Sequence, residues 1–368
     1  MTEKENRYII NNFHAKSLED NPLKSPVDRD INIYLPPDYY KDIDVKYPVI
    51  YFLHGYSGNN WSWTTNFKNA KDIGFDFNAA PPNILNKLDI DRLLTFEKLD
   101  ELIQKGELKP FIYVQPDGSL EIPNKFKRRD LRGKIMTKGS FYVNSPSAGN
   151  YMNYIINDVI DFVDSHYRSI PDKNRRALMG GSMGGYGALY LALHHPDKFI
   201  AVSLLSPGNV GNLDRINWEL RIPIYTELFG EKTSAQIGDF AWKDIMDTYD
   251  LIFSNVNRLI PSIKRDENGN IIGYNKEAFN NWQRNNLLNL IEKYPESLKK
   301  VHLQLNCERT DEFGLADAAI QLHEKLIEKK IEHDYELYSD PKAALTPHIL
   351  GIGYHILPGI KFCLQFIE

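Results

Sequence analysis

The sequence predicts an α/β fold built on a mostly parallel, doubly wound sheet. Short apolar runs rich in β-branched and aromatic residues recur along the 368-residue chain. Several of these runs are continuous rather than alternating, as in strands that are covered on both faces. Segments with the period of a helix lie between the runs. Strands that alternate with helices in this way are typical of a parallel sheet with helices on both of its faces.

The elements follow from these patterns in chain order. The predicted strands are 31–35, 48–53, 110–115, 176–179, 199–205, 301–305 and 334–338. Helical periodicity predicts helices over 151–167, 279–294 and 315–327, and a final helix is expected to begin near Pro358.

The composition fits one globular domain with a large core. Hydrophobic residues make up 42% of the chain and aromatic residues 12%, and no Gly/Ser-rich or Pro-rich linker divides it. Lys and Arg number 44 and Asp and Glu number 49, which gives a formal net charge of −5. This mildly acidic balance argues against a surface that binds nucleic acid or anionic lipid.

Two further expectations concern the cellular setting. The first residues have no apolar segment behind them, and no stretch approaches the ~18 uninterrupted apolar residues of a membrane span. We therefore expect a cytoplasmic protein that is neither secreted nor inserted in a membrane. Cys307 and Cys363 are too few for a disulfide framework and lack the spacing of metal ligands. Both are expected to be reduced and buried.

The region 208–299 interrupts the alternation of strands and helices. We predict that it is an insertion in a single domain, 1–368, whose core is formed by 30–207 and 300–368. An insertion that leaves the carboxyl end of a parallel strand lies on the face where α/β proteins bind ligands. The insertion is therefore expected to form a cap over the functional site.

The most informative stretch is Gly180-Gly-Ser-Met-Gly184, a G-x-S-x-G pattern. A predicted strand ends just before it, and an Ala/Leu-rich helix follows to about His195. Ser182 then lies on a tight strand-to-helix turn, like the nucleophile of α/β-hydrolases, where side chains in place of the two outer glycines would collide with neighbouring backbone. The amino end of the helix also favours a developing negative charge. Ser182 is the predicted nucleophile.

A second loop is expected to complete the site. The second predicted strand ends just before a loop that contains Gly55. In α/β-hydrolases this loop supplies one backbone amide to the tetrahedral oxyanion, and the residue after the nucleophile supplies the other. The predicted donors are the amides of Tyr56 and Met183. Trp61 and Trp63 follow soon after, and each is expected either to line the substrate pocket or to pack in the core.

The acid of a catalytic triad follows the nucleophile in this fold, on a loop after a strand. Asp311 meets this requirement in the loop after the strand 301–305, where its carboxylate can orient a histidine. Three other acidic residues lie nearby: Glu308, Glu312 and Asp317. Asp317 falls within a predicted helix and Glu312 is expected to face solvent, so Asp311 is the predicted acid.

The base must follow Asp311 in the chain. His323 lies within a predicted helix and His333 opens the last strand, which leaves His348 and His355. His348 is the first histidine in the loop after the last strand and is preferred on position, and His355, close to the predicted final helix, is the alternative base. The other histidines considered have neither ligand spacing nor triad order and are expected to be surface or core residues: His14, His166, His194, His195 and His302.

The chain also resembles the putative esterase family of α/β-hydrolases, which includes esterase D, feruloyl and acetylxylan esterases, enterochelin esterase and the antigen 85 mycolyltransferases. The resemblance covers roughly residues 30–207 and 300–360 and is most specific around Ser182. The segments that carry it are Ile33-Tyr-Leu-Pro-Pro-Asp-Tyr39, Tyr47-Pro-Val-Ile-Tyr-Phe-Leu-His-Gly-Tyr56, Gly139-Ser-Phe-Tyr-Val-Asn-Ser-Pro146, Gly149-Asn-Tyr151, Gly181-Ser-Met-Gly-Gly-Tyr-Gly-Ala-Leu189 and His195-Pro-Asp197.

This resemblance implies an α/β-hydrolase fold and ester hydrolysis, with Ser182 as nucleophile, the run from Cys307 to Asp311 as acid loop and His348 as base. The implied substrates are short acyl or hydroxycinnamoyl esters of carbohydrate, such as an oligosaccharide, or of a small alcohol. No metal or organic cofactor is expected. The alternatives are an acyltransferase that passes the acyl group to an alcohol, and a non-catalytic binding module on a hydrolase scaffold. The oligomeric state cannot be predicted from the sequence.

Overall fold

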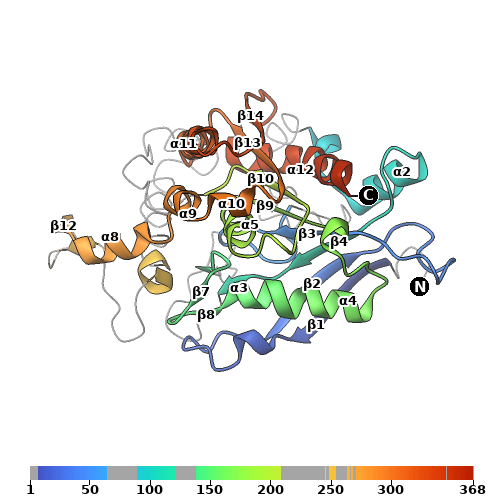
Figure 1. The fold of residues 1–368 in the computed structure, drawn as a ribbon, viewed down its shortest axis with the longest axis horizontal. Coiled ribbons are helices and arrows are strands. Elements are labelled where there is room, and N and C mark those ends of the chain that lie inside the picture. Colours follow the sequence, from blue (N-terminus) through green and yellow to red (C-terminus); the bar gives the residue numbers. More distant parts are fainter. Residues whose placement is uncertain are drawn as a thin grey trace.

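The computed structural model describes residues 7–63, 89–120, 138–208, 245, 248–253, 263–265, 267, 271–344 and 346–367. Within these residues the main sheet has eight strands in the order β1-β2-β4-β3-β9-β10-β13-β14 (Figure 1). Its strands are β1 (Tyr8–His14), β2 (Asp28–Tyr34), β3 (Val49–Leu53), β4 (Ile112–Pro116), β9 (Arg176–Gly181), β10 (Ala201–Leu205), β13 (His302–Glu308) and β14 (Asp334–Tyr338). The pairings from β4 to β14 are parallel, and only β1 and β2 run antiparallel to their neighbours. The predicted mostly parallel α/β sheet is therefore confirmed.

All seven predicted strands are present, with ends that differ by a few residues. The prediction missed β1, which pairs only with β2 at the edge of the sheet. Its residues are half-buried or exposed, and polar Asn11, Asn12 and His14 interrupt its apolar ones. An edge strand needs no continuous apolar run, because much of its surface stays in water.

Helices cover both faces of the sheet (Figure 1). The described α-helices are α2 (Phe96–Gln104), α3 (Tyr151–Asn153), α4 (Ile160–His166), α5 (Met183–His194), α8 (Lys276–Gln283), α9 (Leu287–Lys293), α10 (Pro295–Leu298), α11 (Leu315–Glu328) and α12 (Pro347–Phe366). Of these, α8 extends away from the sheet (Figure 1). Val49, Tyr51 and Leu53 of β3 belong to the core shared with α4, α5 and α11, and Ile50 and Phe52 belong to the core shared with α2 and α12. Both faces of β3 are therefore dry, as its unbroken apolar run predicts.

Two predicted helices differ in detail. The helix predicted over 151–167 consists of α3 and α4, joined by a π-helical turn over Tyr154–Val159. The helix predicted over 279–294 is divided into α8 and α9. Asn286 ends the gap between them, and its side chain accepts a hydrogen bond from the Leu288 amide at the start of α9. A capping asparagine of this kind begins a new helix instead of continuing the old one.

The final helix begins at Pro347, so the predicted start near Pro358 is wrong. Pro347 occupies the first turn, where its missing N–H has no intrahelical partner to lose. Pro358 lies inside the helix, and its local cost is offset because α12 packs in the core against β9, β10 and β13. Among the described helices, α12 alone has the length and apolar character of a membrane span, and most of it is buried inside the protein, as in a core helix.

The predicted insertion is described only in part, and residues 209–244 of it lie outside the described residues. In the described remainder, α9 and α10 pack against α5, and α9 also packs against α11. The insertion also contains a short antiparallel pair, β11 (Ile263–Arg265) with β12 (Ile271–Tyr274). Two other short antiparallel pairs precede the insertion in the chain: β5 (Ser119–Leu120) with β6 (Lys138–Gly139), and β7 (Asn144–Ser145) with β8 (Gly149–Asn150). That the insertion caps the site stays a prediction.

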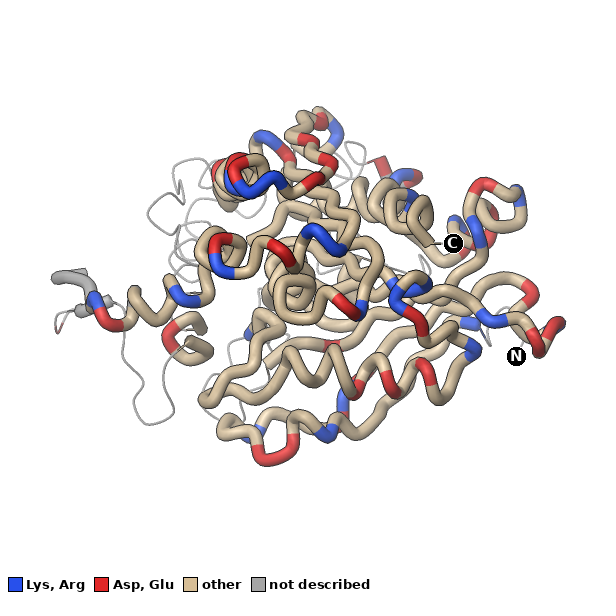
Figure 2. Tube along the Cα trace, viewed as in Figure 1, with Lys and Arg blue, Asp and Glu red and all other residues tan. Residues whose placement is uncertain are grey.

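Acidic and basic residues are interspersed along the described chain (Figure 2). On α11, for example, Lys325 and Lys329 pair with Glu292 of α9 and with Glu328 of their own helix. Exposed pairs of this kind contribute little stability each. The mixing of signs is consistent with the small net charge.

Candidate active site

Ser182 lies at the turn between β9 and α5, in a backbone conformation that L-residues seldom adopt (φ 57°, ψ −118°). Its amide donates to Leu205 O of β10 (2.9 Å), and its carbonyl accepts from the Tyr186 amide (3.0 Å) and the Gly208 amide (2.9 Å). These bonds hold the turn from three sides. The residue is only half-buried, and because it directly follows β9 it lies at the carboxyl end of the parallel strands.

Two glycines make this turn possible. A Cβ on Gly180 would collide with the carbonyl of Gly184, and a Cβ on Gly184 would collide with the carbonyl of Leu53 at the end of β3. The predicted role of both glycines, close approach of backbone to backbone, is therefore confirmed.

The loop after β3, residues 54–63, which we call the β3 loop, lies directly against the Ser182 turn. A Cβ on Gly55 would come within 3.4 Å of Ser182 Cβ and within 2.6 Å of the Trp63 ring. Trp63 also borders Gly181, because a Cβ there would lie 3.3 Å from its ring. The indole of Trp63 is thus next to the nucleophile turn.

The two residues predicted to donate their amides to the oxyanion, Tyr56 and Met183, both pack against Gly139. Met183 is the first residue of α5, where an amide has no intrahelical acceptor. The side chains of Met183 and Tyr56 lie so close to Gly139 that a Cβ at this position would collide with each of them. The loop that carries Tyr56 and the helix that begins at Met183 are therefore packed together. That their amides bind the oxyanion stays a prediction.

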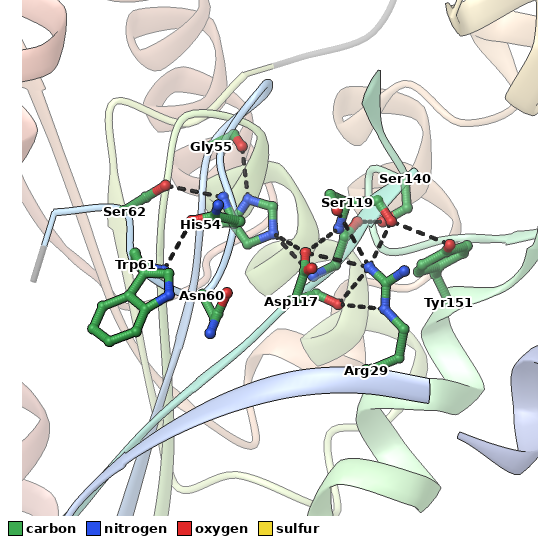
Figure 3. A network of polar contacts seen from close by, with 12 residues as sticks. Arg29, His54, Gly55, Asn60, Trp61, Ser62, Asp117, Ser119, Ser140 and Tyr151 are labelled. Atoms are coloured by element: carbon green, nitrogen blue, oxygen red, sulfur yellow. Dashed lines mark hydrogen bonds and ion pairs between the residues drawn. The ribbon is translucent and has the colours of Figure 1, made fainter. Parts of the chain in front are cut away.

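A buried polar network holds the start of the β3 loop (Figure 3). His54 Nδ1 bonds to Gly55 O (2.8 Å), and His54 Nε2 bonds to the Gly118 amide (2.9 Å). Because an amide donates to Nε2, that nitrogen is the acceptor, and Nδ1 donates to the Gly55 carbonyl. The Tyr142 hydroxyl also donates to His54 O (3.0 Å). His54 thus connects the β3 loop to the loop after β4.

The loop after β4 is held by an ion pair. Arg29 of β2 contacts Asp117 Oδ1 (3.2 Å) and donates to the Asp117 and Ser119 carbonyls. Burial acts to raise the pKa of Asp117, but the Arg29 charge and hydrogen bonding outweigh it and hold that pKa well below its usual range. Sequence reasoning did not find Arg29 or Asp117, because no local pattern marks residues that meet only through the sheet.

The predicted acid and the preferred base are in direct contact. His348 Nδ1 donates to Asp311 Oδ2 (2.6 Å), and both side chains are buried. The other oxygen of Asp311 accepts from the Phe313 amide (2.8 Å), and the Phe313 ring packs on the imidazole with centroids 4.7 Å apart. With Nδ1 as the donor, Nε2 is the nitrogen that can accept a proton.

The rival acids have other positions. Both carboxylate oxygens of Glu308 are occupied by Thr310 and by the Asp340 amide. Asp317 lies in a helix, α11, as predicted, and it is exposed. Glu312 was expected to face solvent, and this is wrong: it is 3% exposed, and its Oε2 accepts from the His348 amide (2.6 Å). Asp311 and Glu312 are neighbours in the chain, and the side chains of both are buried. The prediction assumed that one of the two would be buried and the other would face solvent.

The alternative base, His355, lies two turns further along α12. Its Nδ1 bonds to Gly351 O (2.8 Å), and its ring stacks on Tyr338 with centroids 3.6 Å apart. Neither partner is an acid that could orient it. His323 and His333 bond to each other (2.8 Å). Asp311 therefore has His348, and not His355, within hydrogen-bond distance.

Trp63 connects the β3 loop to the helix that carries His348. Its indole N–H donates to Ile349 O (3.0 Å), and Ile352 of α12 would lie 2.7 Å from a Cβ on Gly181. Within the described residues no hydrogen bond joins the Ser182 hydroxyl to His348. In ligand-free enzymes such bonds are often long and tighten only when substrate binds.

The two predicted tryptophans differ in position. Trp63 packs partly in the core of the α12 face and borders the nucleophile turn. Trp61 is half-buried, and its amide donates to the Asn59 side chain (3.0 Å). Trp63 is therefore the one that the structure brings next to Ser182.

A hydrogen bond joins the described part of the insertion to the β3 loop. The Tyr56 hydroxyl bonds to Thr248 Oγ1 (2.6 Å), and the buried Lys138 ammonium donates to the same oxygen (3.3 Å). Thr248 belongs to the helical residues 248–253.

In the part of the chain that the structure describes, no group of three or more His, Cys, Asp or Glu side chains could hold a metal ion.

Comparison with known proteins agrees with this geometry. The family described as "Putative esterase" matches residues 25–338. A curated relative from Xylanibacter ruminicola, an endo-1,4-beta-xylanase/feruloyl esterase, is 29% identical over 180 residues, which are 48% of this chain and 19% of that protein. The chain therefore spans about a fifth of the length of this relative.

Two solved structures share the fold over nearly the whole chain. A ferulic acid esterase superposes with a TM-score of 0.56 at 17% identity, covering 98% of both chains. The fluorophosphonate-binding serine hydrolase F of Staphylococcus aureus superposes with a TM-score of 0.51 at 14% identity, also covering 98% of both chains. At these identities the similarity establishes the α/β-hydrolase fold.

Proposed function

The chain belongs to the putative esterase family of carboxylic ester hydrolases, and we propose that it is a serine esterase whose triad is Ser182, His348 and Asp311. The observation that carries the proposal is the buried 2.6 Å hydrogen bond between Asp311 and His348. It lies at the carboxyl ends of the parallel strands, where the strained turn presents Ser182.

The proposed reaction begins with proton transfer. His348 Nε2 takes the proton of the Ser182 hydroxyl as the serine oxygen attacks the ester carbonyl. Asp311 holds the imidazole in the required tautomer and stabilises the imidazolium that forms. The amides of Tyr56 and Met183 stabilise the negative charge that develops on the carbonyl oxygen. His348 then protonates the leaving alcohol, and water releases the acid from the acyl-enzyme by the same steps.

For the substrate we propose short acyl or hydroxycinnamoyl esters of carbohydrate or of a small alcohol. Support comes from the family and from the relative whose name includes feruloyl esterase. An ester panel that varies acyl length and aromatic character measures this preference. Addition of an acceptor alcohol during turnover, with measurement of acid against new ester, separates hydrolysis from acyl transfer.

Replacement of the nucleophile tests the proposal. Ser182→Ala is expected to lower kcat for p-nitrophenyl acetate by about 10⁴-fold or more and to abolish labelling by a fluorophosphonate probe, while circular dichroism stays unchanged. The exposed Ser165→Ala serves as the matched control. His348→Ala should lose activity and His355→Ala should retain it. Undiminished turnover by Ser182→Ala would reject the proposal.

A further inference from the structure

Two consecutive carboxylates hold His348 at two different atoms. Asp311 Oδ2 accepts from the imidazole Nδ1 (2.6 Å), and Glu312 Oε2 accepts from the main-chain amide of the same residue (2.6 Å). Both carboxylates are 3% exposed. The triad as proposed above uses only the first contact, so the buried carboxylate of Glu312 has no role in it.

The amino end of α12 depends on this second contact. Thr346 is in the capping position, but its side chain forms no capping hydrogen bond, and its buried Oγ1 has no partner among the described residues. Pro347 has no N–H. His348 therefore carries the first amide of the helix, and Glu312, 36 residues earlier in the chain, accepts its hydrogen bond. A carboxylate at this place is also favoured by the partial positive charge of the helix amino end.

We propose that Glu312 is a positioning residue for the base: its buried carboxylate anchors the main chain of His348 at the first turn of α12, so that the imidazole keeps its place and orientation for catalysis. This inference rests on the proposed function. Asp311 fixes one ring nitrogen of His348. The Glu312 contact holds the main chain that carries the ring, and it couples the acid loop directly to α12.

The charge of Glu312 adds an electrostatic consequence. Burial and the adjacent Asp311 raise its pKa to about 7, against the opposing effect of His348. Among the described residues, the titratable groups that act on it are Asp311 on its own loop and His348 on α12. When Glu312 is ionised, its negative charge favours the imidazolium form of His348. Its replacement by an amide is therefore expected to lower the pH at which His348 loses its proton.

Two variants separate the contact from the charge. Glu312→Ala removes the acceptor, and misplacement of the imidazole is expected to lower kcat by about 10- to 100-fold with KM nearly unchanged. Glu312→Gln keeps an oxygen that accepts from the His348 amide, and it should recover most of the kcat while the acid limb of the kcat/KM profile moves to lower pH. Glu324→Gln, the same substitution at an exposed position of α11, should match the wild type in both readouts.

The measurements are kcat and KM for p-nitrophenyl acetate between pH 5 and pH 9, with thermal unfolding as a check of folding. A Glu312→Ala variant with wild-type kcat, a loss confined to KM, or no recovery in Glu312→Gln overturns the inference. If Glu312→Ala does not fold, the acid limb for Glu312→Gln decides: a shift to lower pH supports the inference and an unmoved limb overturns it. Wild-type protein that is not labelled by a fluorophosphonate probe contradicts the proposed function instead.

Discussion

Ser182 shows how much of a functional site depends on single residues. Its left-handed φ of 57° stores strain of about 1–3 kcal/mol, which persists only because the surrounding structure leaves no alternative. The tight turn needs glycine at two neighbouring positions. Gly180 lies against the carbonyl of Gly184, and Gly184 lies against the carbonyl of Leu53 at the end of β3. This backbone conformation directs the serine side chain away from the end of the sheet.

Gly184→Ala is expected to destabilise the fold by about 2 kcal/mol or more, because the new methyl group would overlap the Leu53 carbonyl. Urea unfolding followed by tryptophan fluorescence measures the free energy of unfolding. The control is Gly208→Ala, whose added Cβ would meet no atom closer than 3.6 Å. Equal stability of the two variants would show that the turn can relax around a side chain at position 184.

At the scale of elements, the site is an assembly of loops that follow β3, β9 and β13, with α12 closing one side. Trp63 bonds to Ile349 of α12 and borders Gly55 and Gly181. His54 bonds to the loop after β4. None of these loops is held by its own local structure alone. Their positions are set by side chains that reach from one loop to the next.

The contact between Tyr56 and Thr248 links the insertion to the β3 loop. Thr248→Val keeps the shape of the side chain but removes the oxygen that bonds to Tyr56 and Lys138. If the Tyr56 amide stabilises the oxyanion, a loosened loop should lower kcat by about tenfold with little change in KM.

Thr248→Ser is the matched control for this prediction, since it retains the hydroxyl. Steady-state kinetics with p-nitrophenyl acetate provide both constants. A Thr248→Val variant as active as Thr248→Ser would mean that the insertion does not help to place the Tyr56 amide.

At the scale of the whole molecule, an ion pair between the buried Arg29 and the half-buried Asp117 joins the antiparallel edge of the sheet to its parallel part. Arg29 comes from β2, and Asp117 follows β4 and lies beside His54 at the end of β3. Removal of one partner of a buried pair leaves the other charge poorly compensated. We therefore expect this contact to stabilise the whole fold and not only the site.

Asp117→Asn is expected to lower the free energy of unfolding at pH 7 by about 3 kcal/mol. The folded-state pKa of Asp117 lies below its ordinary value, so its ionisation contributes stability at neutral pH, and this contribution is lost as the pH falls through the folded-state value. The difference between variant and wild type should therefore shrink below about pH 4.

Urea unfolding at a series of pH values tests this prediction. The exposed Asp197→Asn provides the control and should follow the wild type at every pH. A difference between Asp117→Asn and wild type that stays constant with pH would indicate a packing defect in place of a lost charge.

The sequence by itself determined the parallel strands, the helix after Ser182 and the glycine turn between them, because these follow from local periodicity and from glycines a few residues apart. It also predicted Asp311 as the acid and preferred His348 over His355 as the base. Edge strand β1 and the early start of α12 escaped prediction, because half-exposed apolar residues and a proline at the first helical turn carry weak local signals.

Only the tertiary structure decided which groups meet. It placed His348 against Asp311, turned Glu312 inward to the amide of His348, and joined Arg29 to Asp117 beside His54. Burial and hydrogen bonding of a charged side chain depend on residues that are distant in the chain. Such partners come together only when the strands and helices that carry them pack into one fold.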